Sequence, residues 1–199
     1  MKLVKLAVLF AVIMFAAASS NAAVYFFTPS QPDLQDLDHH DFKSWGIDWS
    51  QHAGERITGA TLTIKNIWDW IREPDDRLYI HLLDNPLMGV RTYFDNQQGG
   101  DNWAGRGPHI TTWTDPVGYV SRNFDLVVNL DAAMLANLNT FAMDGSFGFG
   151  FDPDCHYYND GVSLQIQTED KTTSTPEPAT MALFGLGLAG LGVIRRKKA

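Results

Sequence analysis

Apolar residues alternate with polar or small residues in short stretches along most of the chain, and this pattern limits the fold more than any other feature. A period of two places every second side chain on the same face of a β-strand, whereas a helix needs a period near 3.6. Shorter strands are predicted from Val24 to Phe27, Ile110 to Thr114 and Val117 to Ser121. The longer strands are predicted to carry these sets: Trp45, Ile47 and Trp49; Ala60, Leu62 and Ile64; Leu78, Ile80 and Leu82; Val90, Thr92 and Phe94; Phe124, Leu126, Val128 and Leu130; Phe147, Phe149 and Phe151; Val162, Leu164 and Ile166.

One helical pattern interrupts the strands, from Asp131 to Leu138. Asn129 or Asp131 is expected to cap this helix, and Met134, Leu135 and Leu138 are expected to dock it on the strands. The crossover helices that a parallel sheet requires are missing from the pattern. We therefore predict an all-β fold, an antiparallel, jelly-roll-like β-sandwich with one short helix.

The N-terminus has the pattern of a secretory signal peptide. Lys2 and Lys5 precede the apolar run from Leu6 to Ala18, and Ser20-Asn21-Ala22 offers the small residues that a signal peptidase requires. We expect an N-terminal signal helix that engages the secretion translocon and is cleaved after Ala22. An uncleaved membrane anchor is the alternative interpretation.

A second apolar segment lies at the C-terminus, from Met181 to Ile194. As a helix it would be about 20 Å long, which is shorter than the roughly 30 Å hydrocarbon core of a bilayer. With Pro178 to Thr180 added and its basic side chains snorkelling, it would span a thinned bilayer as a transmembrane helix. The basic residues that follow it predict a cytoplasmic C-terminus: Arg195, Arg196, Lys197 and Lys198. A buried C-terminal helix of a soluble domain is the alternative.

Together, Pro176-Glu177-Pro178, the Gly- and Leu-rich run and the basic end resemble the PEP-CTERM sorting signal. In that family, proteins of Gram-negative bacteria carry such a tail for recognition and cleavage by an exosortase, a membrane cysteine protease. The resemblance implies an exosortase partner, a transient stay in the inner membrane, and a final place at the cell surface or outside the cell. We expect a signal peptide at 1–22, a β-sandwich at 23–170, a linker at 171–175 and the sorting signal at 176–199.

The charge of the middle segment argues against nucleic acid as a partner. Six of the 15 basic residues and one of the 23 acidic residues lie in the two terminal signals, so the segment between them carries 9 basic and 22 acidic residues. Its net charge is therefore near −13. Phosphate binding needs a basic face, which such a segment does not favour.

Two clusters of potential metal ligands flank the predicted sandwich, around residues 36–40 and 151–161. Alternation would place Asp36, Asp38 and His40 on one face. In Greek-key folds the first and last strands often lie side by side, so the two clusters are expected to meet. Carboxylates suit a structural Ca²⁺ ion, for which we consider Asp36, Asp38, Asp152, Asp154 and Asp160. Two alternatives stay open: Zn²⁺ bound by His39, His40, Cys155 and His156, or ordinary turn and surface residues. Both clusters are similar to segments of PEP-CTERM cargo proteins of undefined function.

Cys155 is the only cysteine, so no intramolecular disulfide can form, and a buried thiol is the favoured interpretation over an intermolecular bridge. Loop tryptophans are a further candidate site, because exposed indole rings stack on sugar faces. We consider Trp68, Trp70, Trp103 and Trp113 as glycan-binding residues, with burial in the core as the alternative.

The chain contains no nucleophile elbow, Walker loop or HExxH motif. We predict an exported, non-enzymatic protein with a structural or adhesive role in association with exopolysaccharide. A carbohydrate-binding module is the first alternative, and a secreted hydrolase is the second.

Overall fold

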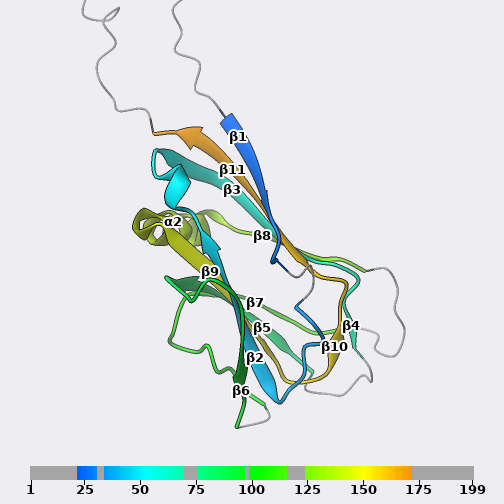
Figure 1. Cartoon of the computed structure of the whole chain (residues 1–199). Coiled ribbons are helices and arrows are strands. Elements are labelled where there is room, and N and C mark those ends of the chain that lie inside the picture. Colours follow the sequence, from blue (N-terminus) through cyan, green and yellow to red (C-terminus); the bar gives the residue numbers. More distant parts are fainter. Residues whose placement is uncertain (1–21, 31–33, 70–75, 97–98, 116–123, 172–199) are drawn as a thin grey trace, which may run out of the picture. The chain divides into compact units, whose positions relative to one another are not determined.

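The structure, a computed structural model, describes residues 22–30, 34–69, 76–96, 99–115 and 124–171. Two antiparallel sheets and one α-helix dominate this part of the chain (Figure 1). This confirms the prediction of a mostly β, antiparallel fold with one helix. The predicted signal helix and C-terminal transmembrane helix lie outside the described residues. Within the described ranges, no helix is both long enough and apolar enough to cross a bilayer.

The first sheet has four strands, and the second has five. In spatial order the first contains β1 (Ala22–Phe27), β11 (Val162–Asp170), β3 (Glu55–Ile64) and β8 (Leu126–Asn129). The second contains β6 (Gly89–Phe94), β2 (Asp41–Asp48), β9 (Ser146–Pro153), β5 (Leu78–Asp84) and β7 (His109–Trp113). A small third sheet pairs β4 (Trp68–Asp69) with β10 (Tyr157–Tyr158). Single 3-10 turns occupy Ser50–His52 and Ala142–Asp144.

The strands of the two large sheets coincide with predicted stretches. In β11, Val162, Leu164 and Ile166 are buried and the residues between them are more exposed, which is the pattern of a strand with one covered face. All eight residues of β9 are buried, because this strand lies inside its sheet with both faces covered. The predicted strand from Val117 to Ser121 lies outside the described residues.

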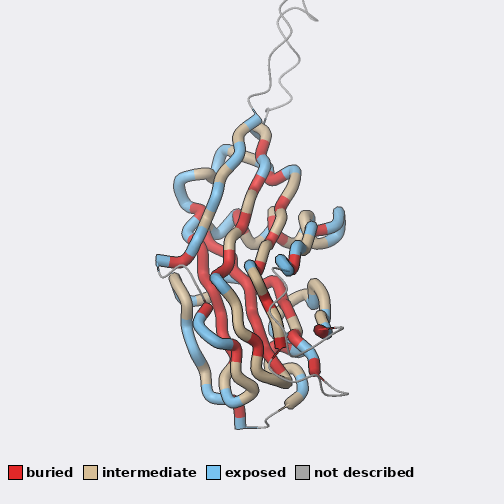
Figure 2. Tube along the Cα trace, turned by 90° about the vertical axis from the view of Figure 1, so that its right-hand side faces the viewer, coloured by how far each residue is buried: buried red, intermediate tan, exposed pale blue. Residues whose placement is uncertain are grey.

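Side chains from both sheets form one apolar core. Leu62 and Leu164 from the first sheet and Ile80 and Phe149 from the second are all fully buried. Figure 2 shows long buried stretches running along adjacent strands. The residues from Ala22 to Asp170 thus pack as one compact unit.

Helix α2 (Ala132–Phe141) covers part of this core. Of the two predicted caps, Asp131 is the one used, since its carboxylate accepts a hydrogen bond from Met134 N at 2.8 Å. Leu138 is fully buried, and Met134 and Leu135 pack against the core as predicted. Asn139 fixes the helix to β3, because its side chain accepts from Ile57 N at 2.9 Å and donates to Ile57 O at 2.8 Å.

The first and last strands lie side by side, as the sequence predicts. β1 pairs with β11 along its whole length, from Ala22 opposite Glu169 to Phe27 opposite Leu164. The chain segments next to these strands also meet. Leu37 and Tyr157 form an isolated antiparallel bridge, with backbone hydrogen bonds of 2.9 and 2.8 Å.

Candidate functional site

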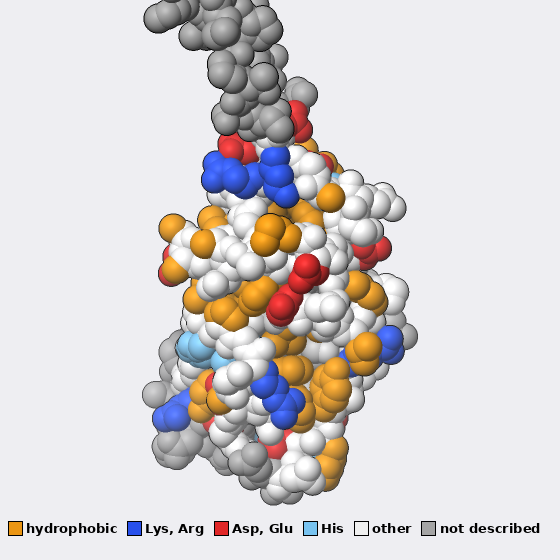
Figure 3. Space-filling model, turned by 90° about the vertical axis from the view of Figure 1, so that its left-hand side faces the viewer, with side chains coloured by type: hydrophobic (Ala, Val, Ile, Leu, Met, Phe, Trp, Pro, Cys, Tyr) orange, Lys and Arg blue, Asp and Glu red, His pale blue; other side chains and the backbone are white. Residues whose placement is uncertain are grey.

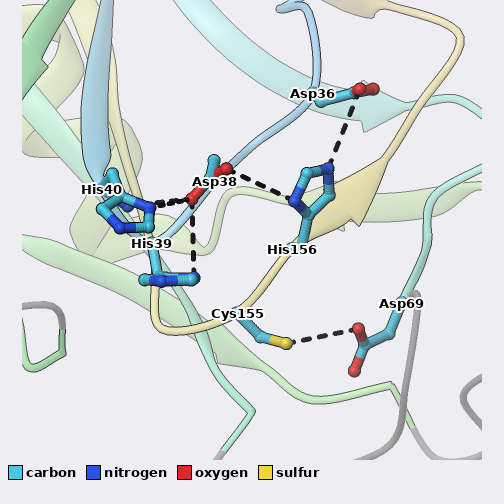
Figure 4. A network of polar contacts seen from close by, with 7 residues as sticks. All are labelled: Asp36, Asp38, His39, His40, Asp69, Cys155 and His156. Carbon is cyan, nitrogen blue, oxygen red and sulfur yellow. Dashed lines mark hydrogen bonds and ion pairs between the residues drawn. The ribbon is translucent and has the colours of Figure 1, made fainter.

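The bridge between Leu37 and Tyr157 brings the two predicted ligand clusters together. Leu37 is fully buried, while Asp36 and Asp38 on either side of it reach His156 (Figure 4). Nδ1 of His156 lies 3.4 Å from an Asp38 carboxylate oxygen, and Nε2 lies 3.8 Å from an Asp36 carboxylate oxygen. The clusters therefore meet through Asp36, Asp38 and His156.

Asp38 is the centre of this group. Its Oδ1 lies 2.7 Å from His40 Nδ1 and 3.5 Å from His39 Nδ1, and it also accepts from the His40 backbone N–H at 3.1 Å. Burial opposes the charged carboxylate, but the hydrogen bonds with His40 and the charges of His39 and His156 outweigh it, so the pKa of Asp38 lies below its usual value. The strand alternation predicted for this segment is wrong after Asp38. Residues 39 and 40 form a turn closed by the Asp38 carboxylate, which brings both histidines to the same oxygen.

Three imidazoles and two carboxylates thus gather at a partly exposed position (Figure 4). The ligand atoms of Asp38, His39 and His40 all lie within 4.8 Å of one another, and imidazole with carboxylate is a donor set suited to Zn²⁺. The four residues considered as zinc ligands do not all lie together in the structure. The three histidines approach Asp38, whereas Cys155 turns to Asp69.

Cys155 belongs to a second, more buried group that sequence analysis missed. Its Sγ donates to Asp69 Oδ1 at 3.4 Å, and ligand atoms of Asp69, Asp76 and Cys155 lie within 4.8 Å of one another. Burial raises the pKa of the Cys155 thiol to about 12, and the charge of Asp69 acts in the same direction. The thiol is therefore protonated at neutral pH, but it is half-buried and not the buried thiol that the sequence favours. The one local signal for this group is Asp69 itself, a carboxylate between two tryptophans.

The other predicted calcium ligands have separate partners. Asp152 is fully buried, and its Oδ2 accepts from the Asn102 backbone N–H. Burial raises the pKa of Asp152 to about 6. The negative charges of Asp95 and Asp101 also raise it, whereas the hydrogen bond from Asn102 lowers it. Asp154 accepts from Gly100 N at 2.7 Å, and Asp160 accepts from Asn66 Nδ2 at 2.9 Å. Of the five residues considered, Asp36 and Asp38 share a contact with His156.

The predicted tryptophans have different surroundings. Trp103 is only 7 % exposed and packs with Phe42 at 5.2 Å between ring centroids, so an exposed sugar platform is the wrong prediction for this residue. The reason is that Gly150 leaves open the space that the indole fills. Trp68 and Trp113 are half-buried and stack on Tyr158 and Phe124, respectively. Trp70 lies outside the described residues.

Comparison with known proteins identifies the tail. Residues 174–197 match the family model described as "PEP-CTERM protein-sorting motif", which confirms the resemblance seen in the sequence. No curated protein matches the chain. Similar solved structures include that of tomato aspermy virus, at 9% identity and TM-score 0.29, covering 89% of this chain and 100% of that one. Another is that of infectious bursal disease virus Gx strain, at 11% identity and TM-score 0.31, covering 80% of this chain and 34% of that one.

Proposed function

We propose that this chain is an exported, non-enzymatic protein with a jelly-roll fold. It acts as a structural or adhesive component of the exopolysaccharide matrix, and its tail carries the PEP-CTERM sorting motif. The observation that carries the proposal is the match of residues 174–197 to the sorting motif, because that motif implies processing by an exosortase and sorting to the cell surface. The signal peptide expected at 1–22 would start the same route.

The jelly-roll assignment is supported by the strand order. Leaving aside β4, β6 and β10, the remaining eight strands are arranged as first, eighth, third and sixth in one sheet, and second, seventh, fourth and fifth in the other. Two interlocked Greek keys give this order in a two-sheet jelly roll. β6 then adds an edge strand next to β2.

A non-enzymatic role is supported by the hydrogen bonds of the buried histidine His81. His81 and Asp101 form a pair at 2.8 Å that resembles a general-base arrangement. The other ring nitrogen of His81 lies 3.1 Å from the carbonyl oxygen of Gly107, and the His81 side chain is 3 % exposed. Both nitrogens are thus engaged in fixing the loop between β6 and β7, away from any substrate in solution.

The surface is consistent with contacts spread over an extended polymer. Several large apolar side chains are exposed, among them Phe26, Leu87 and Phe94. On the face shown in Figure 3, hydrophobic side chains lie in separate groups among acidic and basic ones. That distribution favours many weak contacts over one apolar docking patch on this face.

The test follows the protein from export to the matrix. In a Gram-negative host with a matching exosortase, the full chain is expected at the cell surface, and the form released from cells is expected to sediment with purified exopolysaccharide. A chain that lacks residues 176–199 provides the control for sorting. Surface delivery without any polysaccharide association would overturn the structural role, and release of sugars from the polysaccharide would favour the hydrolase.

A carbohydrate-binding module is the second candidate, favoured by two stacked aromatic pairs. Trp113 and Phe124 stack at 6.2 Å with an interplanar angle of 12°, and Phe124 is 47 % exposed. Trp68 stacks on Tyr158 at 4.5 Å. If these rings bind sugars, Phe124→Ala and Trp68→Ala should lose binding on a glycan array, whereas Leu87→Ala, at another exposed apolar residue, should retain it.

A further inference from the structure

Two adjacent histidines share one carboxylate oxygen at the turn that leads into β2. Oδ1 of Asp38 lies 2.7 Å from Nδ1 of His40 and 3.5 Å from Nδ1 of His39. Ligand atoms of all three residues lie within 4.8 Å of one another. The two imidazole rings lie against each other, with 4.1 Å between their centroids. Three donor atoms are thus within reach of a single ion.

The spacing of these donor atoms is close to that of zinc ligands. Zinc binds nitrogen and carboxylate oxygen at about 2.0–2.2 Å, so two ligands at a tetrahedral angle lie about 3.3–3.6 Å apart. The separation of 3.5 Å between His39 Nδ1 and Asp38 Oδ1 already has this value. His40 Nδ1, at 2.7 Å, is hydrogen-bonded to the same oxygen and would move outward by less than about 1 Å to bind the ion.

The donor chemistry favours zinc over calcium. Imidazole nitrogen is a ligand for zinc and other transition metals, whereas calcium takes oxygen ligands. Zinc sites with two histidines and one carboxylate keep a fourth position for water. The side chains of His39 and His40 are 36 % and 50 % exposed, so water can reach an ion between them.

The backbone that carries these ligands is fixed on both sides of the turn. On one side Leu37 is joined to Tyr157 by two backbone hydrogen bonds of 2.9 and 2.8 Å. On the other side the carbonyl of His40 accepts from the Asp95 backbone N–H at 2.7 Å. An ion that binds here therefore does not have to order the chain, which favours binding.

His156 holds the carboxylate from its other side (Figure 4). Its Nδ1 lies 3.4 Å from Oδ2 of Asp38, whereas Oδ1 is the oxygen that faces His39 and His40. Its Nε2 lies 3.8 Å from a carboxylate oxygen of Asp36. Contacts of this kind fix the orientation of a metal-binding carboxylate and thereby raise its affinity for the ion.

We propose that Asp38, His39 and His40 bind one Zn²⁺ ion, with His156 as a positioning residue for Asp38 and one coordination position open to water. Both ligand imidazoles then bind through Nδ1 and carry their proton on Nε2. Cys155 is not a ligand, because its thiol is turned to Asp69. The site goes beyond the proposed matrix role, since it requires neither exopolysaccharide nor sorting.

The first experiment measures zinc affinity by competition with a chromogenic chelator at neutral pH. It uses the full-length chain in mild detergent, without a histidine tag and freed of metal with EDTA. One zinc ion per chain is expected. Asp38→Asn and His40→Ala should each raise Kd by more than about tenfold, which is the smallest loss typical of changes around a metal site.

Two features make this comparison decisive. Asp38→Asn should fold, because an asparagine oxygen still accepts the bond from the His40 N–H that closes the turn. His109→Ala is the matched control, since this exposed histidine lies in β7, outside the group, and its loss should leave Kd unchanged. The same Kd in the wild type, Asp38→Asn and His40→Ala would overturn the proposal.

Thermal unfolding of the same proteins locates the ion in the folded domain. At about a hundredfold excess of zinc over Kd, Tm of the wild type should rise by roughly 5–10 °C, because the ion binds the folded state. Asp38→Asn should lose this shift at the same zinc concentration. An equal shift in Asp38→Asn would place the ion elsewhere and overturn the site.

His156→Gln tests the positioning role. It should raise Kd for zinc about tenfold while one ion per chain still binds, because the ligands themselves remain. A residue with a purely structural role would lower Tm of the metal-free protein and leave the Kd unchanged. That result would overturn the role given to His156.

The identity of the ion and its place are tested in parallel. Titration with CaCl₂ should leave Tm of the metal-free chain unchanged, and a shift with calcium but not with zinc would overturn the assignment to zinc. Cys155→Ala should keep the zinc affinity of the wild type. Loss of zinc binding in Cys155→Ala, with binding retained in His40→Ala, would place the ion at the group of Asp69, Asp76 and Cys155 and overturn the site.

Discussion

Glu55 holds three strands together through one carboxylate. From its place in β3 it accepts a hydrogen bond from Tyr25 Oη in β1 at 2.7 Å and another from Thr168 Oγ1 in β11, and His52 Nδ1 lies 3.1 Å away. Burial opposes the charge of Glu55, but the hydrogen bonds with Thr168, Tyr25 and His52 outweigh it and lower its pKa. The charged form is therefore the one that stabilises the first sheet.

We expect Glu55→Gln to lower the free energy of unfolding by about 1.5–3 kcal/mol at pH 7, because an amide cannot accept all of these bonds and bonds to charged groups contribute about that much. A lowered folded-state pKa means that the stabilisation is complete above the unfolded pKa, near 4.3, and is lost as pH falls through the folded value. The difference between wild type and variant should thus shrink in acid. Urea unfolding at several pH values measures it.

Glu169→Gln is the matched control in the same sheet. Its partner Arg56 has a side chain that is 60 % exposed, and exposed ion pairs contribute about 0.2–1 kcal/mol. An equal loss in the two variants at pH 7 would contradict the role given to Glu55.

For Asp152 we predict the opposite dependence of the free energy of unfolding on pH. It is fully buried and its pKa is raised to about 6, mainly by burial, so between about pH 4 and 6 the folded state binds more protons than the unfolded state. The free energy of unfolding should therefore fall by about 2 kcal/mol as pH rises through this range. Asp152→Asn should remove the fall and keep the bond from Asn102, because the amide oxygen still accepts. A variant with the same pH profile as the wild type would rule out Asp152 as the cause.

Among the secondary structure elements, β9 depends on glycines as much as on phenylalanines. Phe147, Phe149 and Phe151 are fully buried in the core. On the other face, a Cβ at Gly148 would lie 2.3 Å from the backbone oxygen of Trp45, and a Cβ at Gly150 would lie 2.8 Å from the Trp103 ring. The alternation of Phe and Gly is therefore a packing pattern on both faces of one strand.

Gly150→Ala is expected to destabilise the domain by about 1–3 kcal/mol, because the rigid indole of Trp103 must move. Gly54→Ala is the control, since no atom lies within 4 Å of its added Cβ. Chemical unfolding gives both values. In a Trp103→Leu background the cost of Gly150→Ala should fall, because the smaller side chain leaves room; an undiminished cost would place the strain elsewhere.

The strands and the helix were predictable because their signals are local. Period-two alternation marks the strands of the two large sheets within a few residues, and Asp131 lies next to the helix that it caps. The two-residue strands β4 and β10 are too short to show it and were missed. The group formed by Asp69, Asp76 and Cys155 was not predictable, because Cys155 lies 79 positions after Asp76 and meets the two carboxylates only through the tertiary fold. The burial of Trp103 was missed for the same reason, since the space that it fills is formed by a glycine 47 positions later in the chain.

For the whole molecule, pairing of the first and last strands places both ends of the described domain together. Ala22 lies opposite Glu169, so the expected signal peptide and the sorting tail join the domain at the same end of the β1–β11 pair. Cleavage after Ala22 would leave Ala23 to Phe27 available to pair with β11. Removal of both terminal segments is thus compatible with an intact first sheet.

The sorting tail gives the last prediction. With a matching exosortase, we expect protein released from the surface to lack Pro178 to Ala199, because the sorting motif matched by residues 174–197 implies processing by an exosortase. Replacement of Arg195, Arg196, Lys197 and Lys198 by Gln should weaken membrane retention before cleavage, because the positive charges that we expect to hold the C-terminus in the cytoplasm are lost. Intact-mass measurement and membrane fractionation test the two steps separately. Released protein that still carries Arg195 to Ala199 would refute cleavage, and unchanged retention and orientation of the quadruple variant would refute the role of the basic end.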